Sequence, residues 1–266
     1  MLAQSKVMNE PIRKFELGAL SVVVYPTKEA LGQGAAWAAG AIIRRVIQEK
    51  GRARLMFSAA NSQLDMIANL MSDNEIDWDA VEMFHVDEYA GLPLSHAESF
   101  GGWVKRNVAD VVHPRATYYI RGDAPDAAAE CERYARLLSE RPIDVSFLGI
   151  GENGHIGFND PHAADFFDPE IVKVVTLDEK CRLQQVAEGH WPDFASVPTQ
   201  GYAVTCPALV NASHIICCVP GPRKAEAVRK TLEGPVSESC PASRIRTHPD
   251  ARLCLDADSA AMLRLE

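Results

Sequence analysis

Short apolar runs alternate with longer helical patterns along most of the chain, and this alternation constrains the fold more than any other feature. The runs that we expect to be strands are 20–25, 54–57, 81–86, 143–148, 214–219 and 251–255. They are almost continuously apolar, as strands buried on both faces are. Strands that alternate with helices form a mostly parallel sheet with helices on both faces. We therefore predict an α/β fold, Rossmann-like and doubly wound, with residues 1–266 as a single domain.

The helical patterns between these runs carry start and stop signals. Thr27 is a suitable cap for a helix that runs to Gln48, and Gly51 is a suitable stop signal. Further helices are expected over 64–71, from about 223 to 232, and after Leu255. The stretch 161–194 contains three prolines, and we predict that it is the least regular part of the chain and forms a flap or lid.

Composition and charge exclude several classes of function. Lys and Arg number 27 against 36 Asp and Glu, a net charge of −9, so general binding to nucleic acid is not expected. No uncharged apolar run reaches the roughly 18 residues that a membrane span needs, and residues 1–15 lack the apolar segment of a signal peptide. The seven cysteines form no C-x-x-C pair, which predicts a reducing, cytoplasmic compartment and no zinc ribbon.

Polar and glycine-rich segments follow four of the predicted strands. These segments are 58–62, 87–89, 149–161 and 221–224. In open α/β sheets, ligands bind beyond the carboxyl ends of the strands. We therefore expect carboxylates, an imidazole, a glycine-rich turn and two cations to converge at one edge of the sheet, where they would form a site with acid–base groups and an anion clamp.

The glycine-rich turn contains a G-x-G-x-x-G pattern at Gly149, Gly151 and Gly154. Alone, this pattern is a weak sign of dinucleotide binding, which also requires a helix directly after the third glycine. The sequence from 155 to 161 is poor in helix formers, so we do not predict a nicotinamide cofactor. We expect the glycines to let the backbone turn tightly and present Asn153 and His155 to a substrate.

Three motifs resemble the glucosamine-6-phosphate deaminase (isomerase) family, which shares a superfamily with the 6-phosphogluconolactonases. The motifs are HVDEYAGL at 85–92, LGIGENGHIGFNDP at 148–161 and GPRK at 221–224. The resemblance extends from about residue 25 to residue 255. It implies conversion of glucosamine 6-phosphate and water into fructose 6-phosphate and ammonia, without a metal or organic cofactor.

The resemblance also implies roles for residues of the first two motifs. Asp87 would move a proton between C2 and C1 of the sugar, and a dry position at a strand end would raise its pKa toward the working pH. His155 would open the sugar ring, oriented by Asn153 and Asp160; many family members have Glu at the position of Asp160. Glu88 either supports Asp87 or points elsewhere. The group that protonates the departing amine stays unassigned.

The substrate phosphate is expected at two predicted helix N-termini, because free N–H groups attract anions there. One holds Ala60, Asn61 and Ser62, and the other holds Lys224, which matches the family's phosphate-binding lysine. The segment 59–63 replaces the Thr-Gly-Gly/Ser-Thr-Pro loop that is common in the family. Arg182 lies near the family's phosphate-clamping arginine, although our alignment places Ala187 there.

Other interpretations stay open alongside the deaminase. The chain is alternatively a 6-phosphogluconolactonase, a galactosamine-6-phosphate isomerase or a sugar-phosphate-binding protein without turnover. The expected partner is a small-molecule sugar phosphate, not nucleic acid or membrane, and a homo-oligomer is left open. The remaining singled-out residues are treated as structural or receive no catalytic role: His85, His190, His214, His248, Cys181 and Cys206.

Overall fold

The large sheet has eight strands and is parallel except at one edge. A computed structural model describes residues 10–264. The prediction that residues 1–15 lack a signal peptide concerns a segment of which residues 1–9 lie outside the described range. In sheet order the strands are β1 (Arg13–Leu17), β2 (Leu20–Tyr25), β11 (Ala251–Asp256), β10 (His214–Val219), β7 (Val145–Leu148), β3 (Ala53–Phe57), β4 (Val81–His85) and β6 (Ala116–Thr117). β1 pairs antiparallel with β2, and the other pairings are parallel. The mostly parallel sheet is confirmed.

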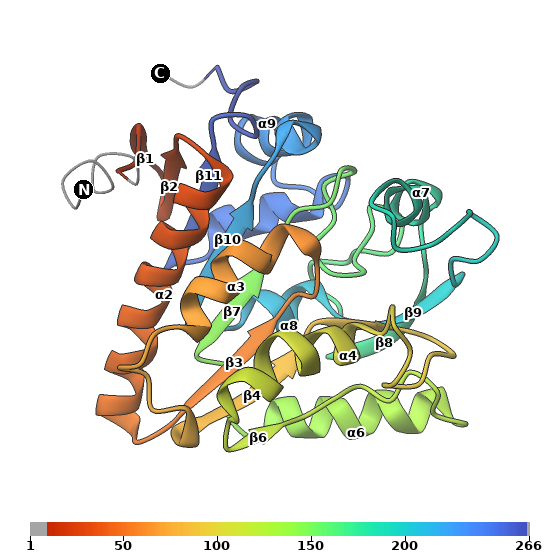
Figure 1. The fold of residues 1–266 in the computed structure, drawn as a ribbon. Helices are drawn as coiled ribbons and strands as arrows, with labels where there is room; N and C mark the ends of the chain where they lie inside the picture. Colours follow the sequence, from red (N-terminus) through yellow and green to blue (C-terminus); the bar gives the residue numbers. More distant parts are fainter. Residues whose placement is uncertain (1–9, 265–266) are drawn as a thin grey trace.

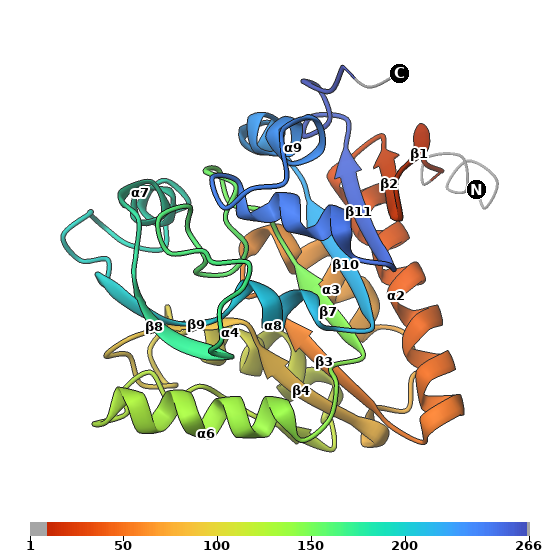
Figure 2. The ribbon, with the colours of Figure 1, turned by 180° about the vertical axis from the view of Figure 1, so that it is seen from behind.

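Helices cover both faces of this sheet (Figures 1 and 2). One face carries α2 (Lys28–Lys50), α3 (Leu64–Met71), α4 (Phe100–Val104), the π-helical turn Lys105–Ala109 and α5 (Asp110–Val112). The other face carries α6 (Ala127–Ser139), α8 (Cys206–Val210), α9 (Ala225–Glu233) and the 3-10 helix Pro241–Thr247. The doubly wound arrangement is therefore confirmed. Shorter 3-10 turns lie at Asn61–Gln63, Trp78–Ala80 and Pro222–Lys224.

The apolar strands build two separate cores because successive side chains point to opposite faces. In β2, Val22 and Val24 pack into the core beneath α6, α8 and α9, whereas Val23 and Tyr25 pack beneath α2 and α3. All four are buried. The continuous apolar runs of the sequence thus reflect burial on both sides.

Local signals at helix ends act as expected at α2 but not at the C-terminus. The Thr27 hydroxyl accepts a hydrogen bond from the Ala30 N–H, and Gly51 takes the left-handed conformation with φ 72°. α2 ends at Lys50, two residues beyond the prediction. The helix expected after Leu255 is wrong, since residues 257–262 form turns.

The C-terminal turns have a local cause in the side chains. The Ser259 N–H donates to the Asp256 carboxylate at 2.7 Å, and the Ser259 hydroxyl accepts from the Asp256 N–H at 3.1 Å. Such side-chain-to-backbone bonds compete with helix formation. They close the chain into turns at the point where β11 leaves the sheet.

A second, antiparallel sheet of three strands was not predicted. Its order is β5 (Asp87–Tyr89), β9 (Gln200–Val204) and β8 (Val172–Thr176). Val86 joins the two sheets: its N–H donates to Phe57 in the large sheet, and its carbonyl accepts from Val204 in the small one. The chain therefore passes from one sheet into the other just before Asp87.

The segment 161–194 is more regular than predicted. It contains β8 and α7 (Glu179–Ala187), and the Asp178 side chain caps α7 by accepting from the Lys180 N–H at 2.8 Å. α7 stands apart from the helices that cover the large sheet, beyond the carboxyl ends of its strands (Figure 1). The three prolines lie outside β8 and α7, which explains why they do not prevent regular structure.

The described helices include none that is both long and apolar enough to span a membrane. All seven cysteines are free thiols, and six of them are buried. Cys217 and Cys218 lie inside β10, where a thiol packs as a small apolar side chain.

Candidate active site

A pocket opens at the carboxyl ends of the central strands, where the sequence predicted convergence. Its lining includes Ser58, Ala60 and Ser62 after β3, Asp87 in β5, 149–151 and His155 after β7, and Lys224 after β10. The free space is small, about 70 Å³. Segments far apart in the chain therefore meet in one crevice, as the topology of an open α/β sheet requires.

Asp87 is a buried carboxyl group on this pocket. The side chain stands at the junction of the two sheets, and the residue is 6% exposed. Burial raises its pKa well above the ordinary value, the nearby charges of Glu88 and Asp160 raise it further, and a hydrogen bond from the Phe158 N–H opposes them. A carboxylate with a raised pKa is a stronger base, which suits proton abstraction from carbon.

His85, treated as structural from the sequence, braces the backbone beneath Asp87. Its Nε2 accepts from the Ile120 N–H at 2.9 Å, so Nδ1 carries the proton and donates to the Asp87 carbonyl at 2.8 Å. Burial lowers the pKa of His85 to about 4, which keeps the ring neutral. This fixed tautomer holds the start of β5 in place.

His155 lies in a hydrogen-bonded group with the two side chains that were predicted to orient it. Its Nδ1 is 2.7 Å from Oδ1 of Asn153 and 3.2 Å from Oδ1 of Asp160. Both oxygens are acceptors, so the proton resides on Nδ1 and Nε2 is left to exchange a proton with a ligand. Asn153 and Asp160 are not part of the pocket lining, and both contact the lining residue His155.

Asp160 is held as a carboxylate despite complete burial. Burial alone would raise its pKa, but the bond and charge of His155 and the donors from Asn153 and the Asp178 N–H together lower it. The carboxylate lies beside Nδ1 and fixes the orientation of the ring. The arrangement is that of an imidazole acid–base with a fixed orienting carboxylate.

The turn that carries His155 depends on glycine at two positions. A Cβ on Gly151 would approach the His155 ring to 2.1 Å, so only glycine leaves room for the imidazole. Gly154 has φ 88°, a conformation that other residues rarely adopt. Residues 152–159 form turns and a bridge rather than a helix, as the sequence predicted.

The anion side of the pocket is formed by Lys224 and the loop after β3. The Lys224 residue is 8% exposed, and burial lowers its pKa while the Glu188 and Glu152 charges raise it. Ala60 and Ser62 line the same pocket, whereas Asn61 lies in an adjoining groove. Lys224 precedes α9 directly, so its ammonium group needs a negative partner at this helix start.

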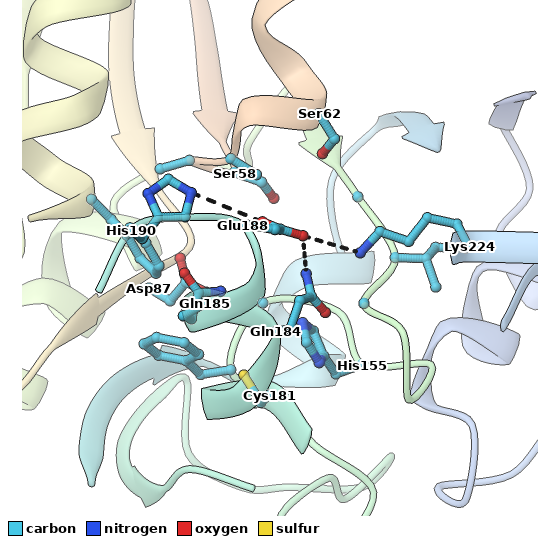
Figure 3. Close-up of a pocket in the computed structure, with 18 residues that line it drawn as sticks. Ser58, Ser62, Asp87, His155, Cys181, Gln184, Gln185, Glu188, His190 and Lys224 are labelled. Carbon is cyan, nitrogen blue, oxygen red and sulfur yellow. Dashed lines mark hydrogen bonds and ion pairs between the residues drawn. The ribbon is translucent and has the colours of Figure 1, made fainter. Parts of the chain in front are cut away.

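The segment 161–194 supplies five lining residues to which the sequence reasoning gave no catalytic or binding role. They are Cys181, Gln184, Gln185, Glu188 and His190. Figure 3 shows Glu188 between Lys224 and His190. The available signal was position, since all five lie within the predicted lid. His190 was treated as structural because it lacked metal-like spacing, and that criterion could not detect a pocket residue.

Glu88 is not part of the pocket lining, so its assignment to the catalytic set is not supported. Its carboxylate accepts four hydrogen bonds, from the N–H groups of Tyr89, Phe100 and Gly101 and from the Ser99 hydroxyl, at 2.7–3.0 Å. Three of these donors lie at the start of α4. Glu88 therefore ties β5 to α4, and side-chain alternation along β5 directs it away from Asp87.

Arg182 is likewise absent from the pocket lining, so its assignment as a phosphate ligand is not supported. Its Nη2 donates to the carbonyls of Phe194 and Val197 at 2.8 Å, and its guanidinium lies 4.0 Å over the Phe194 ring. These contacts use Arg182 to hold the loop that follows α7. The α7 residues that reach the pocket are Cys181, Gln184 and Gln185.

One group of three side chains has the donor types of a metal site. Ligand atoms of His155, Asp160 and Cys181 lie within 4.8 Å of one another. Metal binding requires a thiolate, but burial and the neighbouring carboxylates raise the pKa of Cys181 well above its ordinary value. The donor set therefore fits a metal poorly.

The fold and pocket define a doubly wound α/β protein with a buried carboxyl group, an imidazole held by a carboxylate and a lysine at the carboxyl edge of the sheet. The model of the glucosamine-6-phosphate isomerase/6-phosphogluconolactonase family matches residues 26–254. The chain belongs to this family.

Relatives of this chain carry the deaminase name. A glucosamine-6-phosphate deaminase of Listeria monocytogenes is 36% identical over 190 residues, 71% of this chain and 79% of the relative. That of Bacillus cytotoxicus is 32% identical over 243 residues, 91% and 89% of the two chains.

Solved structures share the fold. A monomeric glucosamine-6-phosphate deaminase superimposes with a TM-score of 0.82 at 30% identity, over 91% of this chain and 99% of the other. The 6-phosphogluconolactonase of Trypanosoma brucei gives 0.76 at 15% identity, over 91% and 98%. The second likeness concerns the fold alone.

Proposed function

We propose that the protein converts glucosamine 6-phosphate and water into fructose 6-phosphate and ammonia without a metal or organic cofactor. The observation that carries this proposal is that Asp87 and His155 line one cavity, together with Lys224. Deaminase relatives at 31–36% identity support the choice of reaction over lactone hydrolysis. The solved 6-phosphogluconolactonases have 15–18% identity to this chain and support the fold only.

Ring opening comes first and is assigned to His155. The imidazole of His155 takes a proton from the anomeric hydroxyl of the sugar and delivers one to the oxygen of the sugar ring. No net proton is consumed. The Asp160 carboxylate stabilises the imidazolium that forms between these two transfers, and Asn153 fixes the ring plane. This assignment uses Nε2, the nitrogen that is not held by these partners.

Isomerisation follows at Asp87. Its carboxylate removes the proton from C2 of the open-chain aldehyde and returns it at C1 after an enol intermediate. Return of the proton at C1 leaves an imine at C2. Water then adds to C2, and cleavage of the C–N bond releases ammonia and leaves the ketone, which balances the reaction. A base buried beside apolar walls suits this step, because desolvation strengthens a carboxylate.

The phosphate is assigned to Lys224 and the loop after β3. Ser62 offers a hydroxyl, and the turn that contains it offers backbone N–H groups. We also propose that 161–194 is a lid, since ligand pockets usually measure about 300–1,000 Å³ and this one holds about 70 Å³. The seven free thiols support a cytoplasmic setting.

The decisive test is a substrate panel on the purified protein. We expect ammonia and ketose from glucosamine 6-phosphate in a one-to-one ratio, slower release from galactosamine 6-phosphate, and no hydrolysis of 6-phosphogluconolactone. Coupled assays measure ammonia, fructose 6-phosphate and the lactone. Hydrolysis of the lactone without ammonia release selects the lactonase alternative, and tight binding of all ligands without product selects the non-catalytic alternative.

Removal of metal ions is expected to leave the activity unchanged. The Asp87 and His155 chemistry is acid–base only, and burial raises the pKa of the Cys181 thiol, whose proton a metal would have to displace. The measurement is kcat/KM after dialysis against EDTA, with elemental analysis of the same sample. Activity that disappears with the chelator and returns with Zn²⁺ contradicts the cofactor-free mechanism.

A further inference from the structure

Glu188 occupies the position beside Lys224 that a phosphate would need. Its Oε1 lies 3.9 Å from the Lys224 Nζ and accepts from the Gln184 Nε2 at 2.8 Å. Its Oε2 lies 3.9 Å from the His190 Nε2. Figure 3 shows the carboxylate pointing into the pocket toward all three groups, opposite Ser58 and Ser62.

The position of Glu188 is fixed by contacts with neighbouring residues. The Gln184 Oε1 accepts from the Glu152 N–H at 3.1 Å, which turns the Gln184 amide so that its Nε2 faces Glu188. His190 is held in turn by Glu98, at 2.9 Å from its Nδ1. The Glu188 N–H closes α7 on the Gln184 carbonyl, so the residue sits at a fixed helix end. The carboxylate is thus presented to Lys224 by the lid segment itself.

Two negative groups beside one lysine repel each other, and this repulsion weakens the binding of the second group. Lys224 is buried, and the two carboxylates whose charges act on it most are Glu188 in the pocket and Glu152 at the rim. A phosphate that approaches Lys224 meets the Glu188 carboxylate within contact distance, and like charges repel strongly in a partly buried site. Either Glu188 leaves or the phosphate binds weakly.

We propose that Glu188 is an internal competitor for the substrate phosphate, which holds Lys224 in the empty site and must be displaced when a sugar phosphate binds. This inference rests on the proposed function for the identity of the anion. Glu188 would then help to set the affinity for sugar phosphates. Its carboxylate, which belongs to the lid, is displaced from Lys224 only by a ligand that binds Lys224 more tightly. A ligand without a phosphate gains nothing from displacing Glu188, so the device favours phosphorylated sugars.

The test measures binding of inorganic phosphate by titration calorimetry, so it does not depend on turnover. Glu188→Gln keeps the shape of the side chain and removes its charge. We expect the Kd for phosphate to fall by roughly tenfold and the KM for glucosamine 6-phosphate to fall with it. The matched control is Glu152→Gln, which removes a rim carboxylate that is paired with Arg223 at 2.9 Å. It should change the Kd by less than roughly threefold, because Glu152 does not occupy the pocket.

Several outcomes overturn the inference. Unchanged or weaker phosphate binding in Glu188→Gln shows that the carboxylate does not compete. Equal gains in phosphate affinity in both variants show a general effect of negative charge instead of competition between Glu188 and phosphate for one position. A raised KM for the amino sugar with unchanged phosphate binding shows that Glu188 recognises the amine. Thermal melting checks folding, and Glu188→Asp, whose shorter arm retreats from Lys224, supplies an intermediate gain if the glutamine variant unfolds.

The two proposals fail in different ways. If neither the wild-type protein nor Glu188→Gln releases ammonia but the variant binds phosphate more tightly, the deaminase function is wrong and the role of Glu188 stands. If ammonia release is normal and phosphate binding is the same in both, the function stands and the competitor role is wrong.

Discussion

Replacing Asp87 with asparagine is expected to abolish ammonia release and, at the same time, to raise the melting temperature. Asparagine has nearly the same shape but cannot take the C2 proton, so kcat should fall by roughly 10³-fold. The KM should change little, since Asp87 lies apart from the phosphate side of the pocket. Ammonia release that survives the substitution removes Asp87 from the proposed mechanism.

The gain in stability follows from the raised pKa of Asp87. Burial favours the protonated form in the folded state, so ionisation costs stability once the pH exceeds the ordinary carboxyl pKa of about 4. The penalty grows as the pH rises toward the raised pKa. Asparagine has no charge to bury, so we expect a gain of about 1–2 kcal/mol near neutral pH, or roughly 3–6 °C.

The pH dependence of the melting temperature tests whether the stability gain comes from removing a buried charge. The difference in melting temperature between Asp87→Asn and the wild type should vanish below about pH 4, where both side chains are neutral. The activity of the wild type should decline on the acid side at a pH above that of an ordinary carboxyl group. A stability gain that is independent of pH would point to packing instead of charge burial.

Replacing the next residue, Glu88, with glutamine is expected to have the opposite consequences. Glutamine places an NH₂ group where a carboxylate oxygen now accepts, so at least one buried donor, such as the Gly101 N–H, loses its acceptor. Burial raises the pKa of Glu88, and the four donors oppose that shift, so the surroundings are built for an acceptor on both oxygens. We expect a loss of about 2–4 kcal/mol, or roughly 5–15 °C in melting temperature.

Activity separates the two carboxylates. Well below its melting temperature, Glu88→Gln should keep kcat within about tenfold of the wild type, because Glu88 does not line the pocket. Activity assays at 10 °C and at 25 °C test this, with thermal melting on the same samples. Complete loss of activity in a folded Glu88→Gln protein would return Glu88 to the catalytic group.

Much of the large sheet was predictable because its signals are local. The strands of the large sheet that carry pocket residues, and α2 with its Thr27 cap and Gly51 stop, follow from apolar runs and capping residues. The convergence of Asp87, His155 and Lys224 followed from a rule about strand ends, not from any contact.

The small sheet was not predictable for the same reason. β5 is three residues long, and its pairing with β9 joins positions more than a hundred residues apart. No periodicity can appear in so short a strand. The pairing places Asp87 in the pocket lining, whereas Glu88 accepts hydrogen bonds from Tyr89 and the start of α4.

The sequence by itself determined the layered α/β architecture and the placement of Asp87, His155 and Lys224 after strands, because burial on two faces and strand ends are visible in neighbouring residues. Only the tertiary structure decided that Glu88 and Arg182 serve as braces and that Glu188 faces Lys224. Those outcomes depend on contacts between segments distant in the chain, and a side chain's partner across such a distance leaves no local pattern.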